Sequence, residues 1–171
     1  LYQAFAWRNW QLTRKSGALG LVFPRSLLGS ASGAEWRITC FAQGKSEVLT
    51  LLNANKWVFP EVHAQYAFAL ISIHKGGESS GQIGIAGPFA SQSDFQSGKG
   101  DLGYLPFSTI ENASTGASIP LLPDAKSSEI YLKLRESGRF DQNPEFSFKV
   151  VREFDATLDR KYFDSSPENG D

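Results

Sequence analysis

Two apolar, strand-like segments in the first half of the chain lie too close together to be neighbouring parallel strands. They are Glu47–Ala54 and Tyr66–His74, and the thirteen residues between Leu52 and Tyr66 show no helical periodicity. Parallel neighbours need a crossover of a dozen or more residues, which is usually helical. The second segment is therefore expected to run antiparallel. Because it is apolar on both faces, we expect it to be central in a sheet or covered on both sides.

The sequence before this pair alternates between helix and strand patterns. Residues 1–15 have apolar side chains at near-helical spacing and end in two basic residues, with Gly17 following as a stop. Residues 18–23 form a short apolar run that Pro24 ends, which is typical of a buried parallel strand. The chain thus begins with a helix and a strand, as in α/β proteins.

A second helix is expected after Ser32, because Ser32 and Glu35 have the spacing of a capping box. This helix would reach Gly44 and present Arg37 at the surface. The lone cysteine, Cys40, excludes an internal disulfide and fits a reducing compartment. It lies on the apolar side of this helix, so we interpret it as a buried structural thiol.

The second half of the chain has weaker patterns, and we find no internal repeat in it. Residues 76–81 are rich in glycine and serine and indicate a flexible loop or linker. Beyond them we expect a strand at Gln82–Ala90, mostly loop over Ser91–Ser118, a helix at Asp124–Glu136 capped by Asp124, and a strand at Phe146–Val151.

Composition limits the classes of protein that this chain can belong to. The 171 residues are 41% hydrophobic and 13% aromatic, enough for one packed domain or slightly more. No run of 18 apolar residues occurs, so we expect no membrane partner. Residues 1–75 carry eight Lys/Arg against three Asp/Glu, and residues 76–171 carry nine against fifteen. The net charge of +5 on residues 1–75 suits an anionic partner, although an ordinary protein surface can also carry a charge of this size.

Four segments carry a family resemblance through their order along the chain. They are Leu1–Phe5, Gly20–Ser26, Glu35–Arg37 and Trp57–Tyr66. Together they resemble class I, S-adenosylmethionine-dependent adenine-N6 DNA methyltransferases. Within these the chain is most similar to the large bacterial enzymes of type IIG restriction–modification and related phage-defence systems. Arg152–Arg160 also resembles the connector that such enzymes carry before their target-recognition region.

The resemblance implies an α/β fold: a partial Rossmann-like methyltransferase sheet ending in an antiparallel strand, plus a loop-rich C-terminal extension. Residues 1–76 would be the second half of the methyltransferase core, and residues 77–171 the extension and connector. Ligands would bind beyond the carboxyl ends of the strands. The partner would be double-stranded DNA with a flipped adenine, since N6 is paired inside the duplex. The implied cofactor of the full-length protein is S-adenosyl-L-methionine, and the implied location is the bacterial cytoplasm.

The family's main cofactor loop and catalytic tetrapeptide would lie upstream of Leu1, so the resemblance assigns no catalytic residue to this chain. The chain opens on mid-helix sequence and contains no methionine, and we interpret it as a fragment. We expect it to be inactive alone and to need the upstream half of the same polypeptide. A half-sheet would leave a strand edge and an apolar face uncovered, so we also expect poor stability.

Two phenylalanines match family positions that contact ligands. Phe5 matches the residue that packs against the cofactor's adenine ring, although its spacing also fits a core-facing helix residue. Phe59 matches the aromatic residue that stacks on the flipped base, although it could instead anchor the loop beneath the sheet. Pro60 follows Phe59 directly, and a rigid turn of this kind is suited to holding a ring at the mouth of a pocket.

Three further residues are candidate contacts with DNA or the pocket. Pro24 and Arg25 follow the first strand at the ligand-binding end of the sheet, where Arg25 either pairs with a phosphate or remains solvated. His63 is expected to make a structural hydrogen bond near the pocket. No metal site is expected, because His63 and His74 have no accompanying cysteines or carboxylate cluster.

Two other functions remain open on the sequence alone. One is a non-catalytic DNA-binding or assembly module that keeps the half-sheet as a scaffold. The other is an unrelated α/β binding domain, against which only the order of the motifs argues.

Overall fold

The computed structural model describes residues 2–114, 116–137 and 160–162. The chain divides into two compact units, Leu1–Ser137 and Gly138–Asp171. In the second unit the described part is one turn of 3-10 helix, η5 (Arg160–Tyr162). Three sequence-based expectations lie outside the described residues: the helical state of Leu1, the strand at 146–151 and all of the connector at 152–160 except its last residue.

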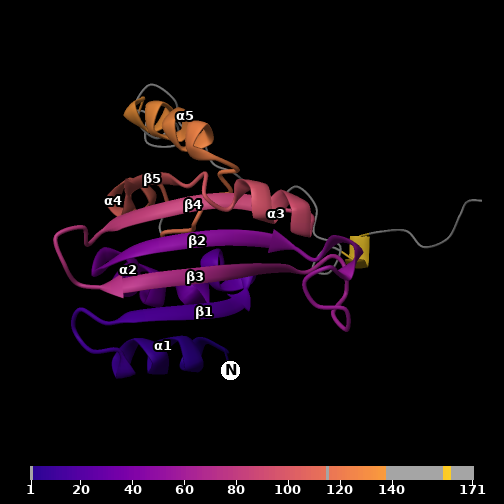
Figure 1. Cartoon of the computed structure of the whole chain (residues 1–171), viewed down its shortest axis with the longest axis horizontal. Coiled ribbons are helices and arrows are strands. Elements are labelled where there is room, and N and C mark those ends of the chain that lie inside the picture. Colours follow the sequence, from indigo (N-terminus) through magenta and orange to yellow (C-terminus); the bar gives the residue numbers. More distant parts are fainter. Residues whose placement is uncertain (1, 115, 138–159, 163–171) are drawn as a thin grey trace, which may run out of the picture. The chain divides into compact units, whose positions relative to one another are not determined.

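The first unit contains a five-stranded open sheet in an α/β arrangement, as expected from the sequence (Figure 1). The strand order is β1-β3-β2-β4-β5, with β3 antiparallel to both β1 and β2, β4 parallel to β2, and β5 antiparallel to β4. The antiparallel direction and central position expected for residues 66–74 are confirmed. The strands are β1 (Ala18–Pro24), β2 (Gly44–Leu52), β3 (Ala67–Lys75), β4 (Gln82–Phe89) and β5 (Gly103–Pro106).

Residues 91–118 are more ordered than their composition indicated. They contain α3 (Gln92–Gly98), β5 and α4 (Phe107–Glu111). Each element is too short for periodicity to reveal it, and pairing with β4 and burial of Phe107 stabilise them instead. The sequence-based boundary at residue 76 falls in the loop between β3 and β4, inside the first unit.

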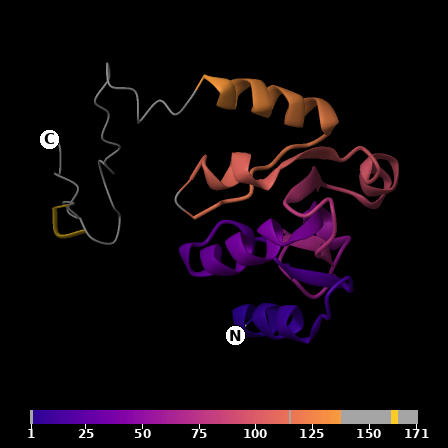
Figure 2. The same cartoon turned by 90° about the vertical axis from the view of Figure 1, so that its left-hand side faces the viewer.

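One face of the sheet is packed against helices. Figure 2 shows α1 (Tyr2–Leu12) and α2 (Ala34–Ala42) on the same side of the strands. Alternate residues of the inner strands point to this side, as the two-residue period of a strand requires. The main core contains, among others, Ala6, Trp10, Trp36, Cys40, Phe41, Val48, Ile71, Ile73, Ile83, Ile85, Leu105 and Phe107.

The expected start of the second helix is wrong in detail. Two 3-10 turns, η1 (Arg25–Leu28) and η2 (Ala31–Gly33), precede α2, and its N-cap is Gly33 without a side-chain bond. The Ser32 hydroxyl instead accepts a hydrogen bond from Gln3 at 2.5 Å. Tertiary contact with α1 therefore replaces the local capping box.

Arg37 is a clear correction, because it is fully buried and not at the surface. Its guanidinium donates to the carbonyl oxygens of Leu27 and Ser30 at 2.5 and 3.0 Å, and to those of Gly116 and Ala117. Burial lowers the pKa of Arg37. This side chain ties α2 to two loops that are far apart in the sequence.

The opposite face of β1, β3 and β2 is not covered by a helix in the described part of the chain (Figure 1). Gly20, Ser72 and Glu47 lie side by side across these strands, and Val22, Leu70 and Leu49 form the next row. A shallow hollow of about 270 Å³ lies over both rows. β1 is an edge strand, and its Val22 is 55% exposed.

The helix expected at Asp124–Glu136 is present as α5 (Ala125–Glu136). As expected, Asp124 is its N-cap, and the carboxylate accepts from the Ser127 amide at 2.7 Å. The Ser127 hydroxyl donates to the same carboxylate oxygen at 2.6 Å, and this bond together with the amide bond lowers the pKa of Asp124. α5 lies beside β5, where the Ser128 hydroxyl donates to the Gly103 carbonyl at 3.4 Å.

Candidate functional site

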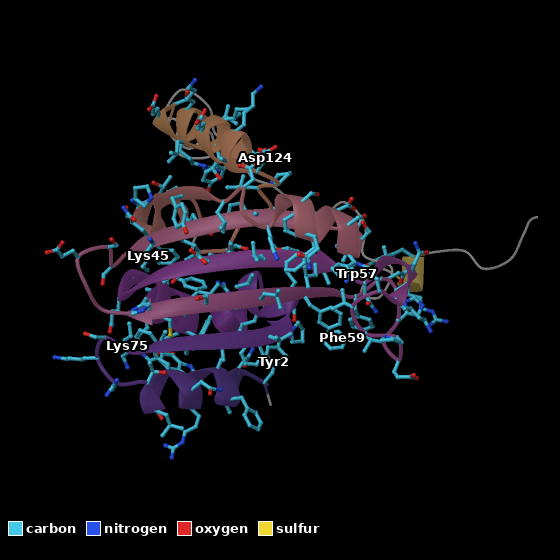
Figure 3. The ribbon with its side chains drawn as sticks, in the orientation of Figure 1. Tyr2, Lys45, Trp57, Phe59, Lys75 and Asp124 are labelled. Carbon is cyan, nitrogen blue, oxygen red and sulfur yellow. The ribbon has the colours of Figure 1, made fainter. Side chains whose placement is uncertain are left out.

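The carboxyl ends of β1, β2 and β4 lie at the same end of the sheet, which we call the carboxyl edge. The loop between β2 and β3 lies at this edge. Pro24, Phe68 and Leu51 are cross-strand neighbours at this edge. Figure 3 shows Trp57 and Phe59 of the loop at this end, and Lys45 and Lys75 at the other. We call residues 53–66 the edge loop. Ligands of open α/β sheets commonly bind at an edge of this kind.

The edge loop is organised by one buried side chain, Asn53, which is 0% exposed. Its Oδ1 accepts hydrogen bonds from the amides of Val58 and Phe59 at 3.1 and 3.0 Å. Its Nδ2 donates to the carbonyls of Phe59, Val62 and His63 at 3.0, 2.9 and 3.5 Å. The amide group is thus satisfied on both sides, as a buried polar group must be.

Phe59 lies at the surface of this loop, with its ring 38% exposed. The ring packs edge-on against Phe68, with 4.7 Å between the centroids. Nearby, the Trp57 indole donates to the Leu52 carbonyl at 2.7 Å and packs against Phe95 of α3. Phe59 is therefore partly buried against Phe68 and partly open to solvent.

Arg25 follows Pro24 at the end of β1 and is half-buried. Its Nη2 donates to the Ile119 carbonyl at 2.8 Å. Its Nε is buried and has no hydrogen-bond partner among the described residues. Desolvation lowers the pKa of Arg25. The loop before α5 therefore holds one side of the Arg25 guanidinium. The N–H groups that are neither bonded to Ile119 nor buried are the ones that can contact an anion.

His63 is exposed in the edge loop, and its Nδ1 accepts a hydrogen bond from the Gln65 amide at 3.3 Å. The His63 carbonyl also accepts from the Tyr66 amide at 3.1 Å. These three residues line a shallow hollow of about 550 Å³. Its lining offers an imidazole, an amide and an aromatic ring that is 58% exposed.

Phe5 is 60% exposed, so it is not a core-facing residue of α1. Tyr2, one turn earlier, holds the start of α1 at the end of β1. Its ring lies 6.2 Å from that of Phe23, and its hydroxyl is 3.2 Å from the Ser26 hydroxyl. The first turn of α1 is thereby fixed near the carboxyl edge of β1, and Phe5 is in that turn.

Pro24 and Phe59 are both neighbours of Phe68 at the carboxyl edge. Arg25 follows Pro24 in the chain, and His63 is in the same loop as Phe59. Phe5 is in the helical turn that contacts the end of β1. Sequence reasoning missed Asn53, which it counted within a strand. An asparagine directly after an apolar strand is a signal for a loop-organising side chain, because asparagine bonds readily to nearby backbone.

Among the residues that the structure describes, no group of three or more His, Cys, Asp or Glu side chains is placed to hold a metal ion. Within the same residues, no helix is both long and apolar enough to cross a bilayer. Cys40 is buried, and this burial raises its pKa to about 12, which is the property of an inert structural thiol.

Comparison with protein-family models gives no match, and comparison with curated proteins gives none either.

Proposed function

We propose that this chain is the second half of the catalytic domain of an adenine-N6 DNA methyltransferase. The full-length protein would transfer a methyl group from S-adenosyl-L-methionine to a flipped adenine in double-stranded DNA. It would act in a bacterial restriction–modification or phage-defence system, in the cytoplasm. The chain alone would be inactive, because the family's catalytic tetrapeptide would lie in the upstream half of the polypeptide.

The observation that carries this proposal is the edge loop itself. Its sequence, Trp57–Tyr66, is one of the segments that resemble the family. In the fold it stands beyond the carboxyl ends of β1 and β2, which run parallel because both are antiparallel to β3. Phe59 in this loop packs against Phe68, and 38% of the residue is exposed. A partly exposed aromatic residue at this end of the sheet supports a role in stacking on a flipped base.

Each residue at the carboxyl edge has its own role in the proposed reaction. Phe59 stacks on the adenine and holds it in plane. His63 borders the adjoining hollow and offers hydrogen bonds there. Arg25 contacts a DNA phosphate through its remaining N–H groups, and Pro24 shapes the end of β1. The basic balance of residues 1–75 supports approach to DNA.

In this proposal, Phe5 is the residue of this chain that contacts the cofactor. Its ring is 60% exposed in a turn fixed to the end of β1, so a planar adenine group can lie against it. S-adenosyl-L-methionine, when bound, supplies the electrophilic methyl group. The other contacts with the cofactor belong to the upstream half in this proposal.

The upstream half of the same polypeptide is the proposed intramolecular partner. β1 is an edge strand, and the face that carries Val22, Leu70 and Leu49 has no covering helix in the described part of the chain. The pairs β1–β3 and β3–β2 are antiparallel, and such pairs can leave one face in water. The support for a partner is therefore the unpaired edge of β1 with its exposed Val22, which a further strand beside β1 would cover.

Substitution of Phe59 by alanine in the full-length protein tests the proposal. Base stacking on an aromatic side chain contributes roughly 1–3 kcal/mol. We therefore expect kcat/KM for methyl transfer to DNA to fall roughly 5- to 150-fold. DNA affinity, which phosphate contacts dominate, should change little. The measurements are transfer of a radiolabelled methyl group and fluorescence anisotropy of labelled DNA.

The matched control is Tyr104→Ala, which removes an aromatic ring of similar exposure, 42%, on β5. It should keep methylation near the wild-type rate. Unchanged methylation by Phe59→Ala would contradict the proposed role, and would leave the non-catalytic DNA-binding or assembly module as the better explanation.

A further inference from the structure

The side chain of Asn53 holds a single residue, Phe59, from both sides. Its Oδ1 accepts from the Phe59 N–H at 3.0 Å, and its Nδ2 donates to the Phe59 carbonyl at 3.0 Å. An asparagine amide has a donor and an acceptor side by side, so it can pair with both backbone groups of one residue. The direction in which the Phe59 side chain leaves the backbone is thereby fixed.

Asn53 also forms hydrogen bonds with other residues of the edge loop. Its side chain bonds to Val58, Val62 and His63, and its own amide donates to the Tyr66 carbonyl at 2.9 Å. It immediately follows β2, whose residues pair along their whole length with β3. The loop is therefore held from a residue that the sheet itself keeps in place.

The Phe59 ring makes one ring-to-ring contact among the described residues, the edge-on contact with Phe68, and 38% of the residue is exposed. Its orientation is set by this contact and by the direction in which the side chain leaves the backbone, which Asn53 fixes. A ring held in advance loses less entropy when a ligand stacks on it.

We propose that Asn53 is the positioning residue for Phe59. It fixes the ring in the orientation in which a planar heterocycle, the flipped adenine of the proposed function, stacks on it. The inference deepens the proposed function and rests on it for the identity of the ligand. Asn53 does not touch the base. It acts through the backbone of the edge loop.

Hydrogen exchange of the edge-loop amides tests the positioning without any ligand. In Asn53→Ala, exchange at Val58 and Phe59 should be roughly tenfold faster, since each loses its acceptor. Amides of the inner strands, such as Val48 and Ile71, should keep their protection and report that the fold is intact. The control Asn55→Gly changes an exposed asparagine of the same loop and still permits its positive φ of 52°.

A second variant, Asn53→Asp, keeps the size and the acceptors but loses the donors to three carbonyls. A buried carboxylate facing carbonyl oxygens has a raised pKa, and its protonated form can donate one hydrogen bond again. Stacking on Phe59 should therefore be weak at pH 8 and partly recover near pH 5.5. The wild type should show no such recovery, and a merely structural defect would not follow this pH profile.

Stacking of a base on Phe59 is measured with a single-stranded oligonucleotide that carries one 2-aminopurine in place of adenine. Its fluorescence is quenched when the base stacks on a ring. Quenching by the wild-type chain should fall about fivefold or more in Phe59→Ala, Asn53→Ala and, at pH 8, Asn53→Asp. Asn55→Gly should retain it.

The outcomes separate this inference from the proposed function. Unchanged exchange at Val58 and Phe59 in Asn53→Ala would overturn the positioning role, as would a loosened loop that still quenches the probe fully. If the loop loosens but the wild type never quenches the probe, the positioning of Phe59 stands and base stacking in the proposed function fails.

Discussion

Single residues in this protein connect segments that the sequence leaves far apart. Asn53 draws the edge loop together from its first residue to Tyr66. Arg37 does the same for α2 and the loops around Leu27 and Gly116. Both side chains are fully buried, and both donate hydrogen bonds to backbone carbonyl groups of other segments.

Arg37→Ala should be among the most destabilising single changes in the chain. It would leave four carbonyls without their donor and a cavity beneath α2, at a cost of about 3–5 kcal/mol in unfolding free energy. Arg37→Lys should lie in between, because one ammonium cannot reproduce the guanidinium fork. Urea unfolding followed by circular dichroism measures both.

Arg8→Ala is the control for this prediction, since Arg8 is an exposed arginine on α1. It should change the unfolding free energy by less than about 0.5 kcal/mol. A similar small loss in Arg37→Ala would show that the carbonyls find other donors, and would contradict the role given to Arg37.

At the scale of elements, long and strongly patterned segments were predicted better than short ones. The sequence correctly placed strands near residues 18–23, 47–54, 66–74 and 82–90 and the helix after Asp124. It missed β5 and α4, which depend on partners and not on their own periodicity. It also assigned Ser32 to a capping box, whereas its hydroxyl contacts Gln3 of α1.

The cap of α5 gives a pH-dependent prediction at this scale. Hydrogen bonds lower the pKa of Asp124, so its contribution to α5 is present above the ordinary carboxyl value and is lost as the pH falls through the folded one. Asp124→Ala should speed exchange of the Ser127 amide roughly fivefold at pH 7. Amide exchange by NMR measures this change.

Comparison with wild type at lower pH completes the test. The difference between wild type and Asp124→Asn should shrink as the carboxylate of the wild type becomes protonated. Ser91→Ala, which removes the cap of α3, should leave α5 unaffected. An Asp124→Ala protein with unchanged exchange at Ser127 would show that packing on β5 alone holds the first turn.

At the scale of the whole molecule, the sheet face that includes Val22, Leu70 and Leu49 is partly uncovered in the described part of the chain. Val22 is 55% exposed, whereas Leu49 and Leu70 are half-buried beside the small cluster of Leu51, Ala86 and Phe89. Exposed apolar surface next to an unpaired strand edge promotes association. We expect the chain, when expressed without the proposed upstream half, to self-associate as its concentration rises. Val22→Lys should reduce this association by placing a charge on the edge strand.

Sedimentation velocity over a range of concentrations measures the effect. Leu134→Lys is the control, because Leu134 is 65% exposed on α5 and is not on this face. A wild-type chain that stays monomeric at every concentration and unfolds cooperatively would contradict the interpretation of this face as a missing interface.

The sequence by itself determined four of the five strands of the sheet and the direction of β3, because strand spacing and apolar patterning are local properties of the chain. It also listed Phe5, Pro24, Arg25, Phe59 and His63, but as separate positions. Only the tertiary structure placed Pro24 and Phe59 beside the same residue, Phe68, and revealed the buried roles of Asn53 and Arg37. Those roles consist of hydrogen bonds to backbone groups elsewhere in the chain, and folding alone decides which backbone groups come within reach.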